Sequence, residues 1–303
     1  MHIPDSMLQG GVCPVTAVVS SIGIATAAYC GMKSEKPSPS RFAAVTTLIF
    51  AGQMMNFPVM DGTSGHLLGG VLAASLLGTS FGVLSVAVVV VIQSLLFSDG
   101  GVTVLGANLF NMAIVGAGVG GLLRSALAAR LRTPGGEIMA TAAAAWASIV
   151  LASVAVSVEL AMDGQIVFSR VVAAMVGTHG LIGIGEAVIT VAACLLLGSA
   201  DAAKSRRGHV IVPFTAAAVI ALALSPFASG FPDGLEWIAG KYAFLHASAP
   251  ALVSPLPDYS VPCIGHERLS TGLSGLAGVM VAFAASWALL RLMGLAVARK
   301  QVA

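Results

Sequence analysis

Residues 170–198 read RVVAAMVGTHGLIGIGEAVITVAACLLLG, a stretch with two charged side chains, Arg170 and Glu186. A helix needs roughly 17–25 predominantly apolar residues to cross a bilayer, so this stretch is long enough to span one. The whole chain shares its character. Of the 303 residues, 57% are hydrophobic and 9% are charged, whereas soluble domains carry roughly 25% charged residues. With a mean hydropathy of +0.95, the sequence predicts an all-α integral membrane protein.

Eight further apolar stretches can be read along the chain on either side of this one. We therefore expect about nine transmembrane helices, although the third and fourth stretches are short for a span. The nine stretches cover residues 14–31, 41–57, 66–79, 81–97, 102–127, 138–161, 170–198, 209–228 and 270–297.

The basic residues indicate the orientation, because cytoplasmic loops of membrane proteins are enriched in Lys and Arg. If nine helices alternate, most of the fifteen cations fall on one side, which supports the count. The N-terminus is then outside and the C-terminus cytoplasmic. The cations on the cytoplasmic side are Lys33, Lys36, Arg41, Arg124, Arg130, Arg132, Lys204, Arg206, Arg207, Arg291, Arg299 and Lys300.

The first apolar stretch lacks the basic region with which a secretory signal begins, since no Lys or Arg precedes Lys33. We expect this stretch to be retained as a span, which leaves His2 in place.

A polar, basic break, GSADAAKSRRGH at residues 198–209, separates two parts of the chain. It predicts a seven-helix domain over residues 1–203 and a two-helix domain over residues 204–303. The two helices of the second domain are joined by a long extracytoplasmic loop, residues 229–269. Prolines and turn residues in this loop favour an ordered but irregular cap.

The chain opens with Met1-His2, which places a free amine one residue before an imidazole. The amine, the His2 amide nitrogen and the His2 ring can close two small chelate rings on one metal ion. Three nitrogens held nearly in a plane, with room for a fourth, suit Ni(II) or Cu(II). A His near the start of a chain is usually incidental, so this reading depends on a further donor.

His66 can supply that donor. It follows a segment broken by Pro58, Gly62 and Gly65, and alternation of the helices places this segment on the same face as Met1-His2. A lone His at the start of a helix is more often a surface or capping residue. Its position beside a glycine-rich loop on the correct face favours ligation, and it predicts a site of four nitrogens.

Several segments resemble the nickel/cobalt family of energy-coupling-factor transporters, in particular its substrate-capturing M component. The tail, with its Pro-Asp-Gly-Leu-Glu and Pro-Leu-Pro-Asp-Tyr motifs, is similar to the small N component of that family, here fused to the M component. The resemblance spans nearly the whole chain. The M-like segments are Met1–Asp5, Asn56–Pro58, Gly62–Gly70, Leu105–Met112 and Gly183–Thr190.

The resemblance implies that the N-terminal segment inserts between the helices and that Met1, His2 and His66 hold the ion. It also implies a transmembrane coupling subunit and ATPase subunits as partners, in the plasma membrane of a prokaryotic cell. Ser6 departs from the family, which commonly has Gly there. That change should alter the N-terminal turn rather than the donors.

Five other residues are weaker candidates. Asn108 and Asn111 can orient ligands or a nearby loop, or else cap helices and join them by hydrogen bonds. Asp61 can hold a metal-bound imidazole, although a solvated loop acid is the preferred reading. His179 and Glu186 are seven residues apart and so share a helix face. An ionisable group in mid-bilayer is costly, so Glu186 should be paired or protonated as a structural or coupling element.

The four cysteines have no C-x-x-C spacing. Cys13 and Cys263 can share the outer face, and whether they pair is left open by the sequence. Cys30 and Cys194 are expected to be packed thiols near the cytoplasmic side.

These features predict a transport subunit for Ni²⁺ or Co²⁺, with a preference for nickel, and no enzymatic activity, resident cofactor or nucleic-acid partner. The chain lacks the G-x-x-x-x-G-K-[ST] loop that cradles ATP phosphates. One alternative is a passive channel or self-powered carrier. Another is an intramembrane hydrolase, suggested by Gly272-Leu273-Ser274-Gly275, but no His follows Ser274 to act as its base. Because nitrogen donors must lose their protons to bind a metal, affinity should fall on acidification.

Overall fold

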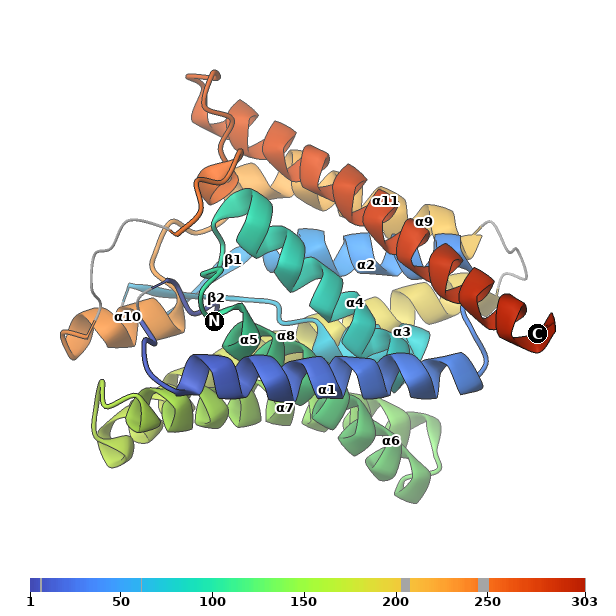
Figure 1. Cartoon of the computed structure of the whole chain (residues 1–303), viewed down its shortest axis with the longest axis horizontal. Helices are drawn as coiled ribbons and strands as arrows, with labels where there is room; N and C mark the ends of the chain where they lie inside the picture. Colours follow the sequence, from blue (N-terminus) through green and yellow to red (C-terminus); the bar gives the residue numbers. More distant parts are fainter. Residues whose placement is uncertain (6, 61, 203–207, 245–250, 303) are drawn as a thin grey trace.

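The computed structural model describes residues 1–5, 7–60, 62–202, 208–244 and 251–302, without the side chains of residues 199–202 and 295–302. Helices make up most of it, and most of them run along the long axis of the molecule (Figure 1). This confirms the predicted all-α class.

The first two thirds of the chain contain eight α-helices, two of which continue into π-helical turns. Their bounds are α1 Val12–Lys33, α2 Pro39–Gln53, α3 Gly70–Leu77, α4 Thr79–Ile92 with η1 Gln93–Phe97, α5 Leu105–Asn108 with η2 Leu109–Val119, α6 Gly120–Arg130, α7 Pro134–Met162 and α8 Phe168–Ala202.

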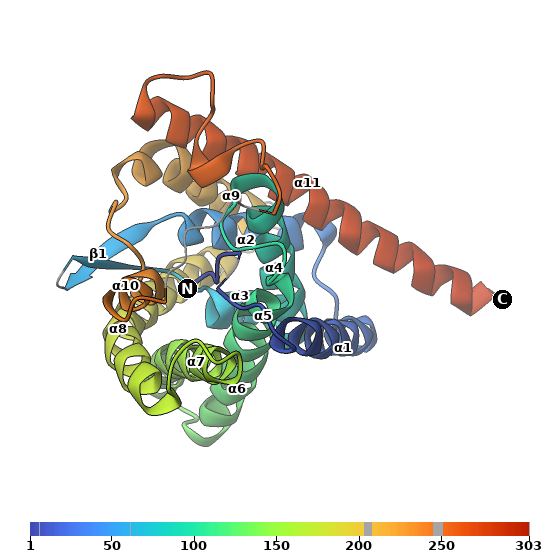
Figure 2. The same cartoon turned by 60° about the vertical axis from the view of Figure 1, so that its left-hand side comes forward.

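The last third adds two long helices joined by an outer segment. Its elements are α9 Gly208–Val219 with η3 Ile220–Leu224 and η4 Ser225–Phe227, α10 Gly234–Lys241, η5 Pro257–Tyr259 and α11 Glu267–Val302. In Figure 2, α9 and α11 lie together above α2. Helix α2 packs against both of them, and α11 also contacts α4.

In the part of the chain that the structure describes, seven helical segments are long and apolar enough to cross a membrane. The expected helix over residues 41–57 is α2, which has 15 residues and is therefore about 22 Å long. The expected helix over residues 66–79 is shorter still, because α3 has 8 residues and begins only at Gly70. The prediction of nine full-length helical spans is therefore wrong for these two.

A β-hairpin replaces the irregular loop expected after the second apolar stretch. Strands β1 (Asn56–Met60) and β2 (Thr63–His66) pair antiparallel, with Asn56 opposite His66. Gly62 has a φ of +76°, which favours glycine, in the turn between them. His66 consequently lies at the end of a buried strand rather than at the start of a helix.

Close packing of α3 against η2 depends on the glycines near residue 116. A Cβ at Gly70 would clash with the backbone of Gly116, and one at Gly116 would clash with the Leu68 side chain. The glycine-rich stretch Gly116–Gly121 therefore serves close helix packing.

The outer segment of the last third is more regular than expected. It contains α10, whose N-terminus carries a capping box in which Asp233 and Glu236 each bond the other's backbone. The boundary predicted between residues 203 and 204 lies outside the described residues. All four cysteines, including Cys13 and Cys263, are free thiols in the structure.

Candidate metal-binding site

The N-terminus is folded into the molecule at the end of the bundle where β2 and α10 lie (Figure 1). Met1 is 5% exposed, His2 8% and Ile3 fully buried, whereas the first residues of a chain are usually frayed unless they are tied down. Burial to this extent indicates a defined position for the terminal amine.

Asn108 holds this segment in place. Its Oδ1 accepts a hydrogen bond from the Ile3 N–H at 2.8 Å, and its Nδ2 donates to the Ile3 carbonyl at 3.0 Å. The Gly101 N–H donates to the same carbonyl at 2.9 Å. The side chain of Asn108 therefore pairs with the backbone of Ile3 much as a neighbouring strand would.

Gly100 and Gly101 leave space for the N-terminal segment because neither has a side chain. A Cβ at Gly101 would clash with the backbone of Asp5, and one at Gly100 would lie 2.9 Å from Asn108 Nδ2. Gly100 also has a φ of +92°, in the region that side-chain-bearing residues rarely adopt.

We expect the affinity for Ni²⁺ to fall about 10–100-fold in Asn108→Ala, because this is the range typical of losing a group that orients a metal ligand. Titration of the purified chain with NiCl₂ measures this. Ser20→Ala is a suitable control, because the Ser20 hydroxyl donates to the Gly106 carbonyl at the same helix without touching the N-terminal segment. Equal affinities for the two variants would exclude this role for Asn108.

One imidazole contacts the terminal amine, and a second imidazole stacks on the first. The Met1 nitrogen contacts His66 Nε2, and the rings of His2 and His66 are stacked with centroids 5.2 Å apart and planes 15° from parallel. His66 Nδ1 lies 3.0 Å from the Leu67 carbonyl, an acceptor that requires the ring proton on Nδ1. The Nε2 lone pair therefore faces the amine.

Burial and the neighbouring terminal ammonium together lower the pKa of His66 to about 3. Its ring is therefore neutral at pH 7, which is the form that binds metals.

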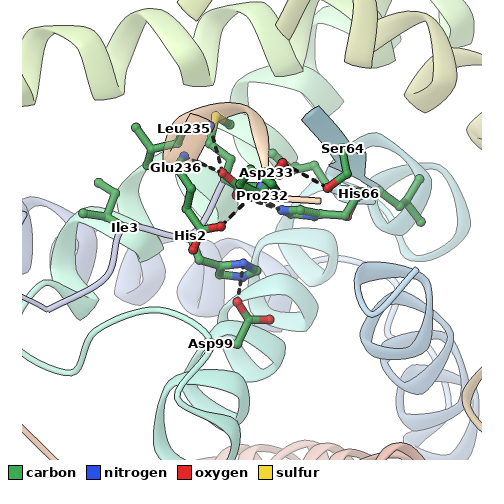
Figure 3. Close-up of polar contacts among 12 residues, drawn as sticks. His2, Ile3, Ser64, His66, Asp99, Pro232, Asp233, Leu235 and Glu236 are labelled. Atoms are coloured by element: carbon green, nitrogen blue, oxygen red, sulfur yellow. Dashed lines mark hydrogen bonds and ion pairs between the residues drawn. The ribbon is translucent and has the colours of Figure 1, made fainter. Parts of the chain in front are cut away.

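Each ring nitrogen of His2 faces an oxygen atom. Nδ1 lies 2.9 Å from Asp99 Oδ1, and Nε2 lies 3.1 Å from Gln93 Oε1. Figure 3 shows the Asp99 carboxylate directly beside the His2 ring. Burial raises the pKa of Asp99, but the attraction of His2 outweighs it and holds that pKa well below its usual value.

The second carboxylate at the site is that of Asp233, at the start of α10. Its Oδ2 lies 2.5 Å from the Met1 nitrogen and 3.9 Å from His66 Nε2. Its Oδ1 accepts from the N–H groups of Leu235 and Glu236 (Figure 3). Burial raises the pKa of Asp233, but the terminal ammonium and His66 outweigh that effect and lower it strongly.

Strand β2 is tied to the segment that carries Asp233. The Ser64 N–H donates to the Pro232 carbonyl at 2.9 Å, and the Ser64 hydroxyl donates to the Phe231 carbonyl at 2.8 Å. These bonds bring Asp233 and His66 to the same amine.

Within the described residues, no three His, Cys, Asp or Glu side chains are grouped so that they could hold a metal ion. A metal at this position would therefore need main-chain nitrogens as donors. The terminal amine and the His2 amide provide them beside the two rings.

Comparison with known proteins identifies the family. Residues 2–203 match the family model CbiM, described as the cobalt uptake substrate-specific transmembrane region, and residues 207–295 match the PDGLE domain. The chain belongs to the CbiM family. Its fused PDGLE domain takes in α9, α10 and the described part of α11 up to residue 295.

Relatives are named as metal transport proteins. The putative fused nickel transport protein NikMN of Archaeoglobus fulgidus is 32% identical over 300 residues, which cover 96% of this chain and 98% of the relative. The fused nickel transport protein NikMN of Rhodobacter capsulatus is 36% identical over 121 residues, covering 38% and 34%. A crystal structure of a transition metal transporter is 28% identical with a TM-score of 0.59, covering 70% of this chain and 97% of that one.

The other candidates from the sequence that the structure describes do not contact the terminal amine. Asn111 donates to Glu159 Oε2 at 2.7 Å and so joins η2 to α7. His179 Nδ1 lies 2.9 Å from the Met175 carbonyl, and its ring lines a small cavity shared with Met1 and His66. Asp61 lies outside the described residues.

Glu186 has hydrogen-bond partners, as expected for an ionisable side chain that is costly to bury in a membrane. Its two carboxylate oxygens accept from the Leu68 N–H at 2.7 Å and the Gly69 N–H at 2.9 Å. Helix α8 thereby fixes the chain directly after His66. Ser274, considered above as a nucleophile, donates its hydroxyl to the Tyr259 carbonyl at 2.5 Å.

Sequence reasoning missed four residues of this site: Gln93, Asp99, Asp233 and Tyr259. In the sequence, Asp99 and Asp233 are acids in the loops that helix alternation places on the outer face, with no partner indicated for either. The signal available for Asp233 was its spacing to Glu236, which is a capping box. That signal places a helix in the PDGLE domain but says nothing of what the carboxylate contacts.

Proposed function

We propose that the chain is the substrate-specificity component of an ATP-driven importer of the energy-coupling-factor type for nickel or cobalt ions. The ion is held by the Met1 amine, the His2 amide and Nδ1, and His66 Nε2. The observation that carries this proposal is the contact of the buried terminal amine with His66 Nε2, beside the His2 ring.

The chelate geometry follows from the covalent structure. The amine and the His2 amide nitrogen close a five-membered ring on the metal, and the amide and Nδ1 of His2 close a six-membered ring. His66 completes four nitrogens, which favour tetragonal Ni(II). Binding replaces the contacts of Nδ1 with Asp99 and of the amine with Asp233.

A cavity of 390 Å³ supports an access route for the ion. Both rings of the site line it, together with residues of the two domains. Clefts lined by one sign of charge concentrate ions of the opposite sign. The carboxylates along this cavity are Asp99, Asp233, Glu236 and Asp258.

Energy for import comes, in this proposal, from separate ATPase subunits joined through a transmembrane coupling subunit in the plasma membrane of a prokaryotic cell. The chain alone captures the ion on the outside. Release on the inside requires the partner subunits, which reorient the chain.

Reconstitution into vesicles tests this. The chain alone should bind one Ni²⁺ or Co²⁺ without accumulating it, and accumulation should appear with the coupling and ATPase subunits and require ATP. Accumulation by the chain alone would instead establish a passive channel or self-powered carrier.

A further inference from the structure

Tyr259 lies next to the proposed metal site although it belongs to the PDGLE domain. It ends η5, and its ring stacks on Phe97 with centroids 4.7 Å apart and planes 22° from parallel. Phe50 packs nearby, with its ring centroid 6.3 Å from that of Tyr259. The aromatic contacts hold the Tyr259 ring against η1 and α2.

The backbone at this point is strained. Asp258 has a φ of +50° and Tyr259 a φ of +53°, a region that residues with side chains seldom adopt. Strained residues of this kind persist only where the surroundings hold them, and they cluster at functional sites. Here the Ser274 hydroxyl holds the Tyr259 carbonyl.

The Tyr259 hydroxyl makes two hydrogen bonds, and their directions are fixed. It lies 2.5 Å from Asp99 Oδ2 and 3.0 Å from Gln93 Nε2. A carboxylate accepts and an amide NH₂ donates. The single hydroxyl proton therefore goes to Asp99, while the hydroxyl oxygen accepts from Gln93.

This arrangement decides which way the Gln93 amide faces. Because its NH₂ group is engaged by Tyr259, its Oε1 is the atom that faces His2 Nε2, at 3.1 Å. An amide oxygen only accepts, so His2 Nε2 carries a hydrogen and donates it. Without the tyrosine hydroxyl, the amide could turn over and present its NH₂ group to the ring.

The orientation matters because the two ring nitrogens of His2 are not equivalent for chelation. Nδ1 closes a six-membered ring with the amide nitrogen of the same residue, whereas Nε2 is too distant along the ring to do so. An acceptor on Nε2–H holds the ring by the nitrogen that does not chelate, and Nδ1, which faces Asp99 in the structure, is the nitrogen that can exchange its partner for a metal.

We propose that Tyr259 is a positioning residue for the metal site: through Gln93 it holds the His2 ring by Nε2, so that Nδ1 can exchange its contact with Asp99 for Ni²⁺ or Co²⁺. This inference rests on the function proposed above. It gives the PDGLE domain a part in metal affinity through a side chain that does not touch the ion.

Tyr259→Phe tests the inference in the full chain, because it removes the hydroxyl and keeps the stacked ring. With NiCl₂ as the probe, we expect one ion per chain, an affinity about 10–100-fold lower and a changed d–d absorption spectrum of the bound nickel. Tyr242→Phe is the matched control. It removes a tyrosine hydroxyl at the C-terminal end of α10, where the side chain is 37% exposed, and it should leave affinity and spectrum unchanged.

A double-mutant cycle adds a readout that a merely structural role would not move. Since Tyr259 acts through Gln93, the variant Tyr259→Phe/Gln93→Leu should lose no more affinity than Gln93→Leu alone. Additive losses would overturn the inference, as would wild-type affinity and an unchanged spectrum in Tyr259→Phe.

Failure of the inference is distinguishable from failure of the proposed function. If the unsubstituted chain binds no Ni²⁺ or Co²⁺, or if His66→Ala binds the ion equally well, the proposed site is wrong. If the unsubstituted chain binds, His66→Ala does not and Tyr259→Phe is unchanged, only the role of Tyr259 is wrong.

Discussion

Adding one glycine ahead of Met1 should weaken Ni²⁺ binding by more than about 100-fold. Loss of a residue that only hydrogen-bonds a metal ligand already lowers metal affinity about 10–100-fold, and this change removes a ligand itself. The extension turns the terminal amine into an amide and so removes one of the four proposed donors. It also has little space to occupy, since Met1 is 5% exposed and lies between His66 and Asp233.

Equilibrium dialysis of the purified chain, followed by element-resolved metal analysis, measures this loss. A glycine appended to the other end of the chain is the control and should bind as the parent does. Full binding by the N-terminally extended protein would remove the amine from the site.

His66→Ala should abolish high-affinity capture to a similar extent. The substitution removes the one proposed donor that does not come from the first two residues, and an alanine there leaves a tridentate site. His66 is 7% exposed and ends a strand fixed by Glu186 and by the Phe231–Pro232 carbonyls. Its surroundings should therefore persist without the ring.

The matched control is His266→Asn on the exposed segment before α11. His266 Nδ1 accepts a hydrogen bond from the Leu269 N–H, a role that asparagine can retain. Metal uptake by cells that carry the full transporter is the readout. Unchanged uptake with His66→Ala would refute the site assignment.

The class of the fold could be predicted because it depends on composition and on long apolar stretches. The helix lengths could not, since α2 and α3 look like spans in the sequence. Gly62, Gly65 and Gly69 are compatible with either a loop or a hairpin, and only pairing with β1 and the bonds from Glu186 decide between them. Tertiary contacts override local preference at this point.

The proposed donors could be predicted because covalent structure brings three of them together. The contact of the amine with His66 spans 65 residues, and it was reached through helix alternation and family resemblance. Asp233 lies 232 residues from Met1, and nothing local to Phe231–Glu236 indicates a partner at the other end of the chain. Asp99, Gln93 and Tyr259 likewise acquire their roles only when η1 and η5 meet.

The most direct test of the account is X-ray absorption at the nickel edge of the loaded chain. We predict a first shell of four nitrogen ligands with the scattering pattern of two imidazoles, and a pattern without the His66 imidazole when His66→Ala is loaded at a large excess of nickel. A first shell of six oxygens, or one containing sulfur, would contradict the proposed site.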